Sequence, residues 1–234
     1  MDPIIDYRTA RPTTVVLTQF MNRVYGWMAF GLLITAVVSY VIGTDPVLVQ
    51  ALAGKIMFLI ILQFGLVMGL SFGINRISVG AATALFLAYS FLTGVVFSTL
   101  FILYTQGSLF QTFGVTAGAF AGLAIWGTVT KRDLTGMGTF MTMGLWGIIV
   151  AMFVNYFLKS TALDTVVSFA GVLIFSGLTA WDVQKIRAFG MRGQTDTDAG
   201  HKFAIIGALT LYLDFINLFL FLLRFMGNGN NRRN

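Results

Sequence analysis

Asp214 is the residue of this 234-residue chain whose surroundings most suggest chemistry. It lies near the middle of the run Leu209-Thr-Leu-Tyr-Leu-Asp-Phe-Ile-Asn-Leu-Phe-Leu-Phe-Leu-Leu. An aspartate at the centre of a bilayer costs about 2.5–3.5 kcal/mol, so it should face other helices, find a partner or hold a proton. Asn217 follows three residues later and would share its helix face. The structural alternative is a protonated carboxyl that ties helices together by hydrogen bonds.

Asp182 and Arg76 are two further charged residues at the edges of apolar runs. Asp182 follows the run Gly177-Leu-Thr-Ala-Trp. Lys185 lies three residues after it, so an ordinary salt bridge at the membrane boundary is an equal alternative to a functional role. Arg76 lies at the inner end of a predicted span, where a plain positively charged anchor is the alternative.

The elements that carry these residues are membrane helices. Hydrophobic residues make up 57% of the chain and charged residues only 10%, whereas soluble domains contain about 25% charged residues. The stretches 56–74 and 79–104 contain no Asp, Glu, Lys or Arg, and roughly 20 apolar residues in a helix cross a bilayer. We therefore predict an all-α polytopic membrane protein with seven spans, at about 25–43, 56–74, 79–104, 109–129, 137–158, 165–181 and 203–225.

These spans form one predicted membrane domain, residues 25–226. A cytoplasmic segment, 1–24, precedes it, and a disordered tail, 227–234, follows it. The polar stretch 182–202 has the composition of a flexible cytoplasmic loop. We predict first that segment 203–225 crosses the membrane, because it is long enough to do so. A re-entrant segment is the alternative, and it would return the tail to the inner side.

Basic residues in the connections indicate the orientation. With the N-terminus in the cytoplasm, ten basic residues lie inside, namely Arg8, Arg11, Arg23, Arg76, Lys131, Arg132, Lys185, Arg187, Arg192 and Lys202. Five lie outside, namely Lys55, Lys159, Arg224, Arg232 and Arg233. The net charge of +6 is thus explained by membrane orientation, without a nucleic-acid partner.

Composition also limits the possible cofactors. The chain has no cysteine and one histidine, His201. Disulfides and thiolate metal sites are therefore excluded, and one histidine cannot build a zinc or haem site. We expect no bound cofactor.

Two runs of the chain resemble the Bax inhibitor-1 family. The first, Ala208-Leu-Thr-Leu-Tyr-Leu-Asp-Phe-Ile-Asn-Leu-Phe-Leu-Phe-Leu-Leu-Arg, is similar to the family's last helix. The second, Phe175-Ser-Gly-Leu-Thr-Ala-Trp-Asp-Val-Gln-Lys, is similar to the end of its sixth helix, with Trp181 and Val183 in place of the usual Tyr and Thr. Two shorter runs, Tyr25-Gly-Trp-Met and Thr130-Lys-Arg-Asp-Leu, resemble the bacterial inner-membrane branch.

The resemblance implies a fold and a function. Six helices would surround a central seventh in a bacterial inner membrane. The function would be a pH-sensitive calcium leak channel, in which Asp182 and Asp214 share a proton and Arg76 acts as a gating latch. Two carboxylates close together in a low dielectric cannot both ionise cheaply, which suits a proton sensor. Such a pair offers at most four oxygens to Ca²⁺, which prefers six to eight, so the metal site would be weak and hydrated.

Two other functions compete with this one. A regulatory membrane protein could bind a membrane protease or another membrane partner without transporting ions. An intramembrane aspartyl protease also uses two aspartates on adjacent helices. The chain departs from that pattern, because Asp214 follows Leu211-Tyr-Leu and no proline occurs after Pro46. We therefore predict that the protein is not an enzyme.

Overall fold

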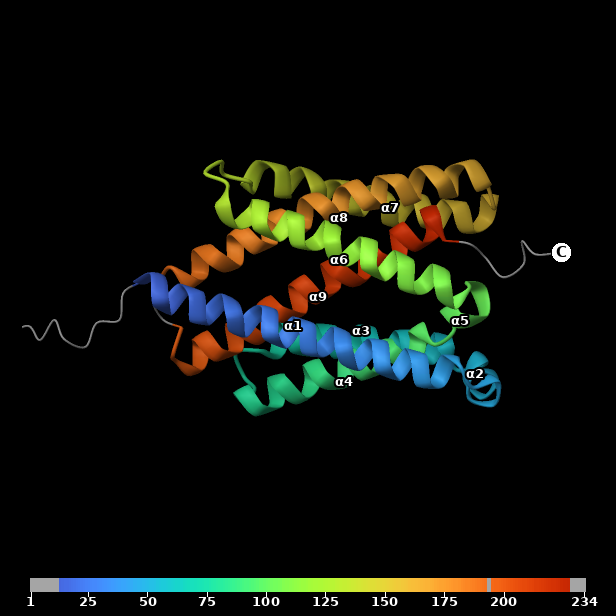
Figure 1. Cartoon of the computed structure of the whole chain (residues 1–234), viewed down its shortest axis with the longest axis horizontal. Coiled ribbons are helices and arrows are strands. Elements are labelled where there is room, and N and C mark those ends of the chain that lie inside the picture. Colours follow the sequence, from blue (N-terminus) through green and yellow to red (C-terminus); the bar gives the residue numbers. More distant parts are fainter. Residues whose placement is uncertain (1–12, 193–194, 228–234) are drawn as a thin grey trace, which may run out of the picture.

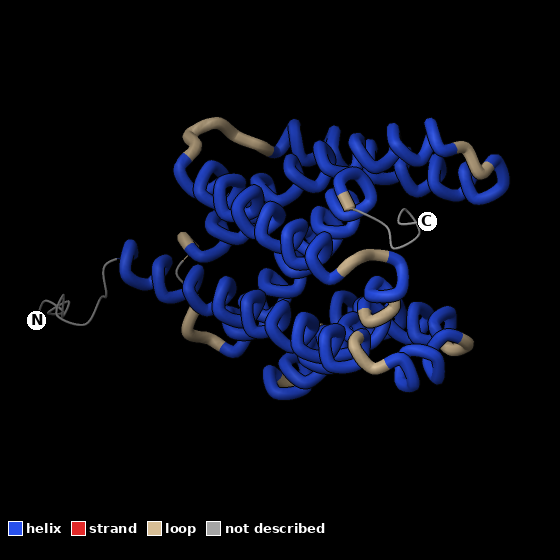
Figure 2. The backbone as a smooth tube through the Cα atoms, turned by 45° about the vertical axis from the view of Figure 1, so that its right-hand side comes forward, coloured by secondary structure: helices blue, strands red, loops and turns tan. Residues whose placement is uncertain are grey.

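The computed structural model describes residues 13–192 and 195–227. Within these ranges the chain is helical, and seven helices are long and apolar enough to cross a membrane. Figure 2 shows helices in blue through nearly the whole described backbone, with the tan loops at their ends. The predicted all-α class and the seven spans are thus confirmed. The helices are α1 (Thr13–Gly43), α2 (Pro46–Ala53), α3 (Ile56–Gly73), α4 (Val79–Phe97), α5 (Leu100–Leu103), α6 (Gln106–Val129), α7 (Thr135–Leu158), α8 (Thr161–Gly190) and α9 (Asp198–Met226).

Several helix ends differ from the prediction on the side of the molecule that we predict to be cytoplasmic. Helix α1 begins at Thr13 instead of near residue 25. Helix α8 continues to Gly190 and α9 begins at Asp198, so the expected loop 182–202 is wrong over most of its length. Long basic side chains can reach water while their helix continues, so polar residues did not mark the end of α8. Residues 1–12 and 228–234, including Arg8, Arg11 and the predicted tail, lie outside the described residues.

The seven spans form two groups with α9 between them (Figure 1). Helices α1, α3 and α4 lie on one side, and α6, α7 and α8 lie on the other. Helix α9 packs against α1, α4, α6 and α8, while α3 packs chiefly on α4 and α7 chiefly on α8. In its most apolar window 67% of α9 is buried, against 6% for α3 and 11% for α7. Helix α9 is therefore the core helix, and four of the other six spans provide most of its cover.

Glycines let α6 and α7 approach α8 closely. A Cβ atom on Gly127 of α6 would lie 2.4 Å from the carbonyl oxygen of Ala180 in α8. A Cβ atom on Gly138 of α7 would lie 2.1 Å from the ring of Trp181. Small residues at helix interfaces allow this kind of close backbone approach in membranes. Both contacts fix α8 directly before Asp182.

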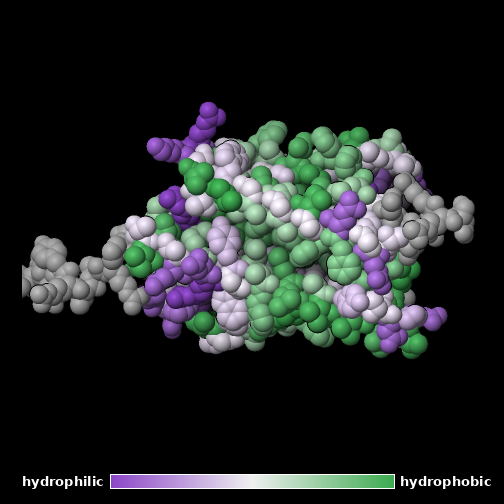
Figure 3. Space-filling view, viewed as in Figure 1, coloured by the Kyte–Doolittle hydropathy of each residue, from purple (hydrophilic) through white to green (hydrophobic). Residues whose placement is uncertain are grey.

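The outer surface has the polarity pattern of a membrane protein. Figure 3 shows a broad hydrophobic zone in the middle of the molecule and hydrophilic residues towards its two ends. Large apolar side chains such as Phe58, Phe72, Trp146 and Phe157 are strongly exposed. In water this would be costly, so we place this zone in the hydrocarbon of the bilayer.

Candidate functional site

Asp182 of α8 and Asp214 of α9 face each other inside the helix bundle. Only 6% of Asp182 and 5% of Asp214 is exposed. Both side chains line the same cavity, and the two carboxyl groups interact electrostatically. Two carboxylates this close in a buried site repel each other, which favours one proton on the pair. The structure thus brings together the two aspartates that the sequence singled out.

Lys185 is the cationic partner of Asp182. Its Nζ lies 2.6 Å from Oδ1 of Asp182 and 4.4 Å from the centre of the Trp181 ring. The ion pair that spacing alone suggested is therefore present. It does not lie at a helix end, because α8 continues for eight residues after Asp182.

One oxygen of Asp214 lacks a donor. Its Oδ2 is buried and receives no hydrogen bond from the described residues. Asn217, expected on the same face, instead donates to the carbonyl oxygen of Leu213 at 2.8 Å. A buried carboxylate oxygen without a donor is costly, so this atom is the natural position for a proton, a water molecule or a cation.

The carboxyl pair lies in the wall of a cavity of about 520 Å³ between α7, α8 and α9. Its polar and charged lining residues are Thr142, Asp182, Lys185, Thr210, Asp214, Asn217 and Arg224. Thr210 and Arg224 are fourteen residues apart on α9, which corresponds to about 21 Å along the helix axis. The cavity thus extends through most of a hydrocarbon core that is about 30 Å thick.

The far end of this cavity carries a second charged pair. Nη1 of Arg224 lies 3.9 Å from Oδ1 of Asp164, and both side chains are well exposed. Beside them, burial raises the pKa of the Tyr104 hydroxyl; Arg224 lowers that pKa and Asp164 raises it. Asp214 and Arg224 are ten residues apart, so about 15 Å along the axis of α9 separates the carboxyl pair from this end of the cavity.

Arg76 does not contact the carboxyl pair in this structure. It is exposed in the short connection between α3 and α4, and its backbone N–H donates to the carbonyl oxygen of Gly73. Asp182 is bound by Lys185. A latch formed by Arg76 would therefore require a different arrangement of helices.

A buried polar cluster around Tyr212 was missed by the sequence analysis. The Tyr212 hydroxyl lies 2.7 Å from Oγ1 of Thr35, which donates to the carbonyl oxygen of Ser90 at 2.8 Å. The rings of Phe86 and Tyr89 pack edge-on against Tyr212 at 5.9 Å. The cluster ties α9 to α1 and α4, on the other side of α9 from Asp214. Hydroxyl residues within three separate apolar runs were the available signal.

Gln184 is a second residue that was missed. Its Oε1 accepts from the backbone N–H of Leu134 at 2.9 Å, and its Nε2 donates to the carbonyl oxygen of Arg132 at 2.8 Å. Next to it, Thr135 donates through its hydroxyl and its N–H to Asp133, and these bonds lower the pKa of Asp133. The connection between α6 and α7 is thus attached to α8 two residues after Asp182.

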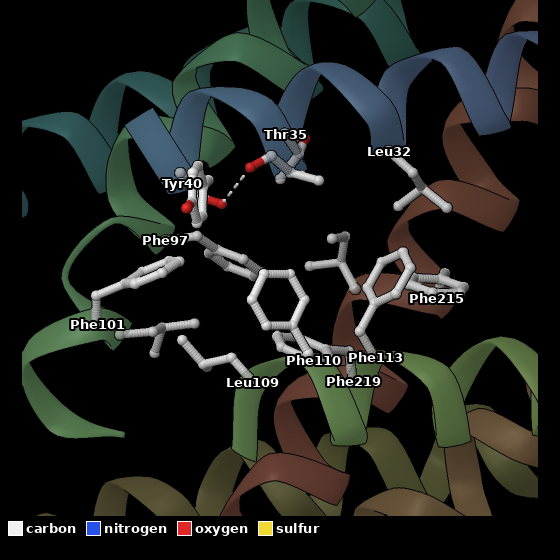
Figure 4. Close-up of a pocket in the computed structure, with 14 residues that line it drawn as sticks. Leu32, Thr35, Tyr40, Phe97, Phe101, Leu109, Phe110, Phe113, Phe215 and Phe219 are labelled. Atoms are coloured by element: carbon white, nitrogen blue, oxygen red, sulfur yellow. Dashed lines mark hydrogen bonds between the residues drawn. The ribbon is translucent and has the colours of Figure 1, made fainter. Parts of the chain in front are cut away.

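A separate apolar recess lies between α1 and α6. Figure 4 shows phenylalanine rings from several helices around its walls. Its volume is about 220 Å³ and none of its lining residues is charged. A neighbouring recess of about 790 Å³ shares four lining residues with it. Neither recess is lined by a carboxylate, so the carboxyl pair remains the candidate functional site.

Comparison with known proteins gives consistent matches over nearly the whole chain. The family model described as "Inhibitor of apoptosis-promoting Bax1" matches residues 17–231. The inner membrane protein YbhL of Escherichia coli strain K12 is 48% identical over 216 residues, covering 91% of this chain and 92% of YbhL. An uncharacterized protein of Borreliella burgdorferi is 46% identical over 231 residues, covering 97% of this chain and 100% of that protein. One from Deinococcus radiodurans is 41% identical over 224 residues, covering 96% and 95%.

Proposed function

This chain belongs to the Bax inhibitor-1 family, and on that premise we propose that it is a pH-sensitive cation leak channel of the inner membrane, with Ca²⁺ as the transported ion. The observation that carries the proposal is the pair formed by Asp182 and Asp214. Two buried carboxyl groups line one cavity that extends along three spans. Ionisable groups at membrane depth commonly mark ion pathways.

Protonation would control the charge of this site. With one shared proton, the single remaining negative charge is balanced by Lys185, so the site attracts no further cation. Loss of that proton leaves two carboxylates with one ammonium and a net charge of −1. The site then attracts a cation, and Ca²⁺ would take carboxylate oxygens, other oxygens of the cavity wall and water to reach six to eight ligands.

The test is Ca²⁺ flux into liposomes that contain only this protein, measured between about pH 6 and 8, where a coupled carboxyl pair can titrate. Asp182→Asn and Asp214→Asn keep side-chain size but remove ionisation. Each should flatten the pH dependence of the flux, and the double variant should add little, because the two groups act as one unit. Asp198→Asn, on the exposed first turn of α9, is the matched control and should leave the pH dependence unchanged.

Two results would count against this assignment. Additive effects of the two substitutions would show that the carboxyl groups act independently. A normal pH response in Asp214→Asn would show that the pair has only a structural role. Each variant is compared with the unaltered protein by size-exclusion chromatography, so that loss of folding is recognised.

Arg76 can be tested in the same assay. We propose that Arg76 holds Asp182 in a closed state of the channel. Arg76→Ala should then raise the basal leak. An unchanged leak in a well-folded variant would leave Arg76 the role of a positively charged anchor at the membrane surface.

The competing function is regulation of a membrane protease or another membrane partner without transport. The peripheral position of α3, of which 6% is buried in its most apolar window, favours it, because such a helix leaves an apolar face free for another membrane protein. Absence of flux above protein-free liposomes would favour this role over a leak.

A further inference from the structure

We propose that Lys185 is a tethered counter-cation, which occupies the place on Asp182 that a transported cation must take and thereby makes the site select divalent over monovalent cations. This inference rests on the proposed function and deepens it, since it names the residue that determines the class of ion. It also makes a statement about binding that can be tested without transport.

The two members of this ion pair differ in their access to water. The side chain of Lys185 is 51% exposed, whereas that of Asp182 is 9% exposed. The ammonium can therefore leave the pair, while the carboxylate cannot follow it. A long, flexible lysine stem allows such a movement without any change in the helix.

Lys185 has a defined position when it is bound. Its Nζ contacts Oδ1 of Asp182 at 2.6 Å and lies over the Trp181 ring at 4.4 Å. Trp181 is in turn held by the close approach of Gly138. The ammonium thus occupies a prepared position on the carboxylate, and a cation arriving from the cavity meets an occupied site.

Few other charges surround the pair. The charged groups that interact electrostatically with Asp182 are Lys185 and Asp214, and those that interact with Asp214 are Asp182 and Lys185. The cavity residues contributed by α7 are uncharged. Arg224 lines the same cavity but lies at its far end, about 15 Å along the axis of α9 from Asp214. Within the described residues, Lys185 is therefore the cation that a transported ion has to displace.

Charge then decides which ions can replace the ammonium. A monovalent cation substitutes one unit charge for another and loses hydration without a Coulombic gain. A divalent cation doubles the attraction to the two carboxylates at the same distance. Lys185, once displaced, regains full hydration at the membrane surface. The attraction of an ion to the carboxylates must therefore exceed that of the tethered ammonium, which favours ions of charge +2.

The first experiment uses the unaltered protein in nanodiscs. Lys185 and Lys131 are acetylated with acetic anhydride at pH 8, with and without Ca²⁺ at constant ionic strength, and quantified by mass spectrometry. Lys131 is exposed at the same membrane side and is the internal control. Saturating Ca²⁺ should raise acetylation of Lys185 relative to Lys131 by about tenfold, equivalent to the loss of a 1.4 kcal/mol restraint. Na⁺ at the same ionic strength should not.

The second experiment measures selectivity in liposomes. Lys185→Gln and Lys185→Met remove the ammonium, and Lys131→Gln is the control variant. The ratio of Na⁺ to Ca²⁺ flux at pH 8 should rise about tenfold in both Lys185 variants, as expected for loss of a 1.4 kcal/mol discrimination. Lys185→Arg should keep the ratio close to that of the unaltered protein.

The outcomes separate this inference from the proposed function. Flux without any Ca²⁺-dependent acetylation of Lys185, or with unchanged selectivity in folded Lys185 variants, would overturn the inference and leave the leak intact. Ca²⁺-dependent acetylation without flux would overturn the leak and support Lys185 as the displaced counter-cation. If neither Lys185 variant folds, the acetylation experiment on the unaltered protein decides alone.

Discussion

Replacing Gly127 by alanine should separate α6 from α8 next to the carboxyl pair. The added Cβ atom would lie 2.4 Å from the carbonyl oxygen of Ala180, whereas ordinary van der Waals contacts begin at 3.4 Å. The obstacle is backbone and cannot rotate away. The two helices must therefore move apart by about 1 Å at this point.

The size of the effect follows from two opposing contributions. Alanine is the better helix former by about 0.8–1.0 kcal/mol, which favours the variant. Overpacking of a tight interface costs about 1–3 kcal/mol. The expected net effect of Gly127→Ala is a destabilisation of up to about 2 kcal/mol.

Gly122→Ala provides a matched control on the same helix. No heavy atom within 4 Å would meet its added Cβ atom, so only the gain in helix propensity remains. Unfolding of both variants in mixed micelles with increasing denaturing detergent, followed by circular dichroism, gives the comparison. Gly127→Ala should unfold at lower detergent fractions than the unaltered protein, and Gly122→Ala at equal or higher fractions.

The same variant reports on the site, because Ala180 lies two residues before Asp182. A movement of about 1 Å there is large compared with the length of a hydrogen bond, so the pH dependence of flux should also change. Equal unfolding curves for the two alanine variants would refute the reasoning. They would show that the approach of α6 to α8 adapts freely and does not position the carboxyl pair.

Three further predictions concern other parts of the chain. Reporter fusions after Asn234 should lie on the outer side of the membrane, because seven crossings would follow the cytoplasmic N-terminus that we predict; a cytoplasmic reporter would contradict this topology. The lowered pKa of Asp133 means that its hydrogen bonds to Thr135 stabilise the start of α7 above the ordinary pKa of 3.8 and lose this effect as the pH falls below it. Hydrogen exchange there should accelerate in acid, and Asp133→Ala should remove that pH dependence. Tyr212→Phe removes the hydroxyl bonded to Thr35 and should cost about 1 kcal/mol in the same detergent unfolding assay, whereas an unchanged stability would show that this buried bond contributes little.

The spans were predictable because membrane insertion depends on local composition. Each apolar run is long enough by itself, so no knowledge of neighbouring helices is needed. The same holds for Asp214, whose unusual position is visible within a single run. Its contact with Asp182 could be inferred only through the family resemblance, because nothing in the spacing of two distant residues determines which helix faces meet.

The end of α8 was not predictable by the same argument. Lys185 and Arg187 have the polarity of a loop, but a helix satisfies its own backbone hydrogen bonds and can continue into water. Tyr212 was missed for a different reason. It looks like any other aromatic residue in an apolar run, and its hydroxyl gains significance only from Thr35, 177 positions away in the chain.

The order of the helices along the chain has a consequence for biogenesis. The ribosome makes α9, the most buried span, after the other six spans. Until it arrives, the faces of α1, α4, α6 and α8 that it will cover must remain against lipid or one another. The native core therefore cannot form during synthesis of the first six spans, and assembly becomes a late step that follows insertion. A chain interrupted before Asp198 would carry the first six spans but lack the helix that fills its core.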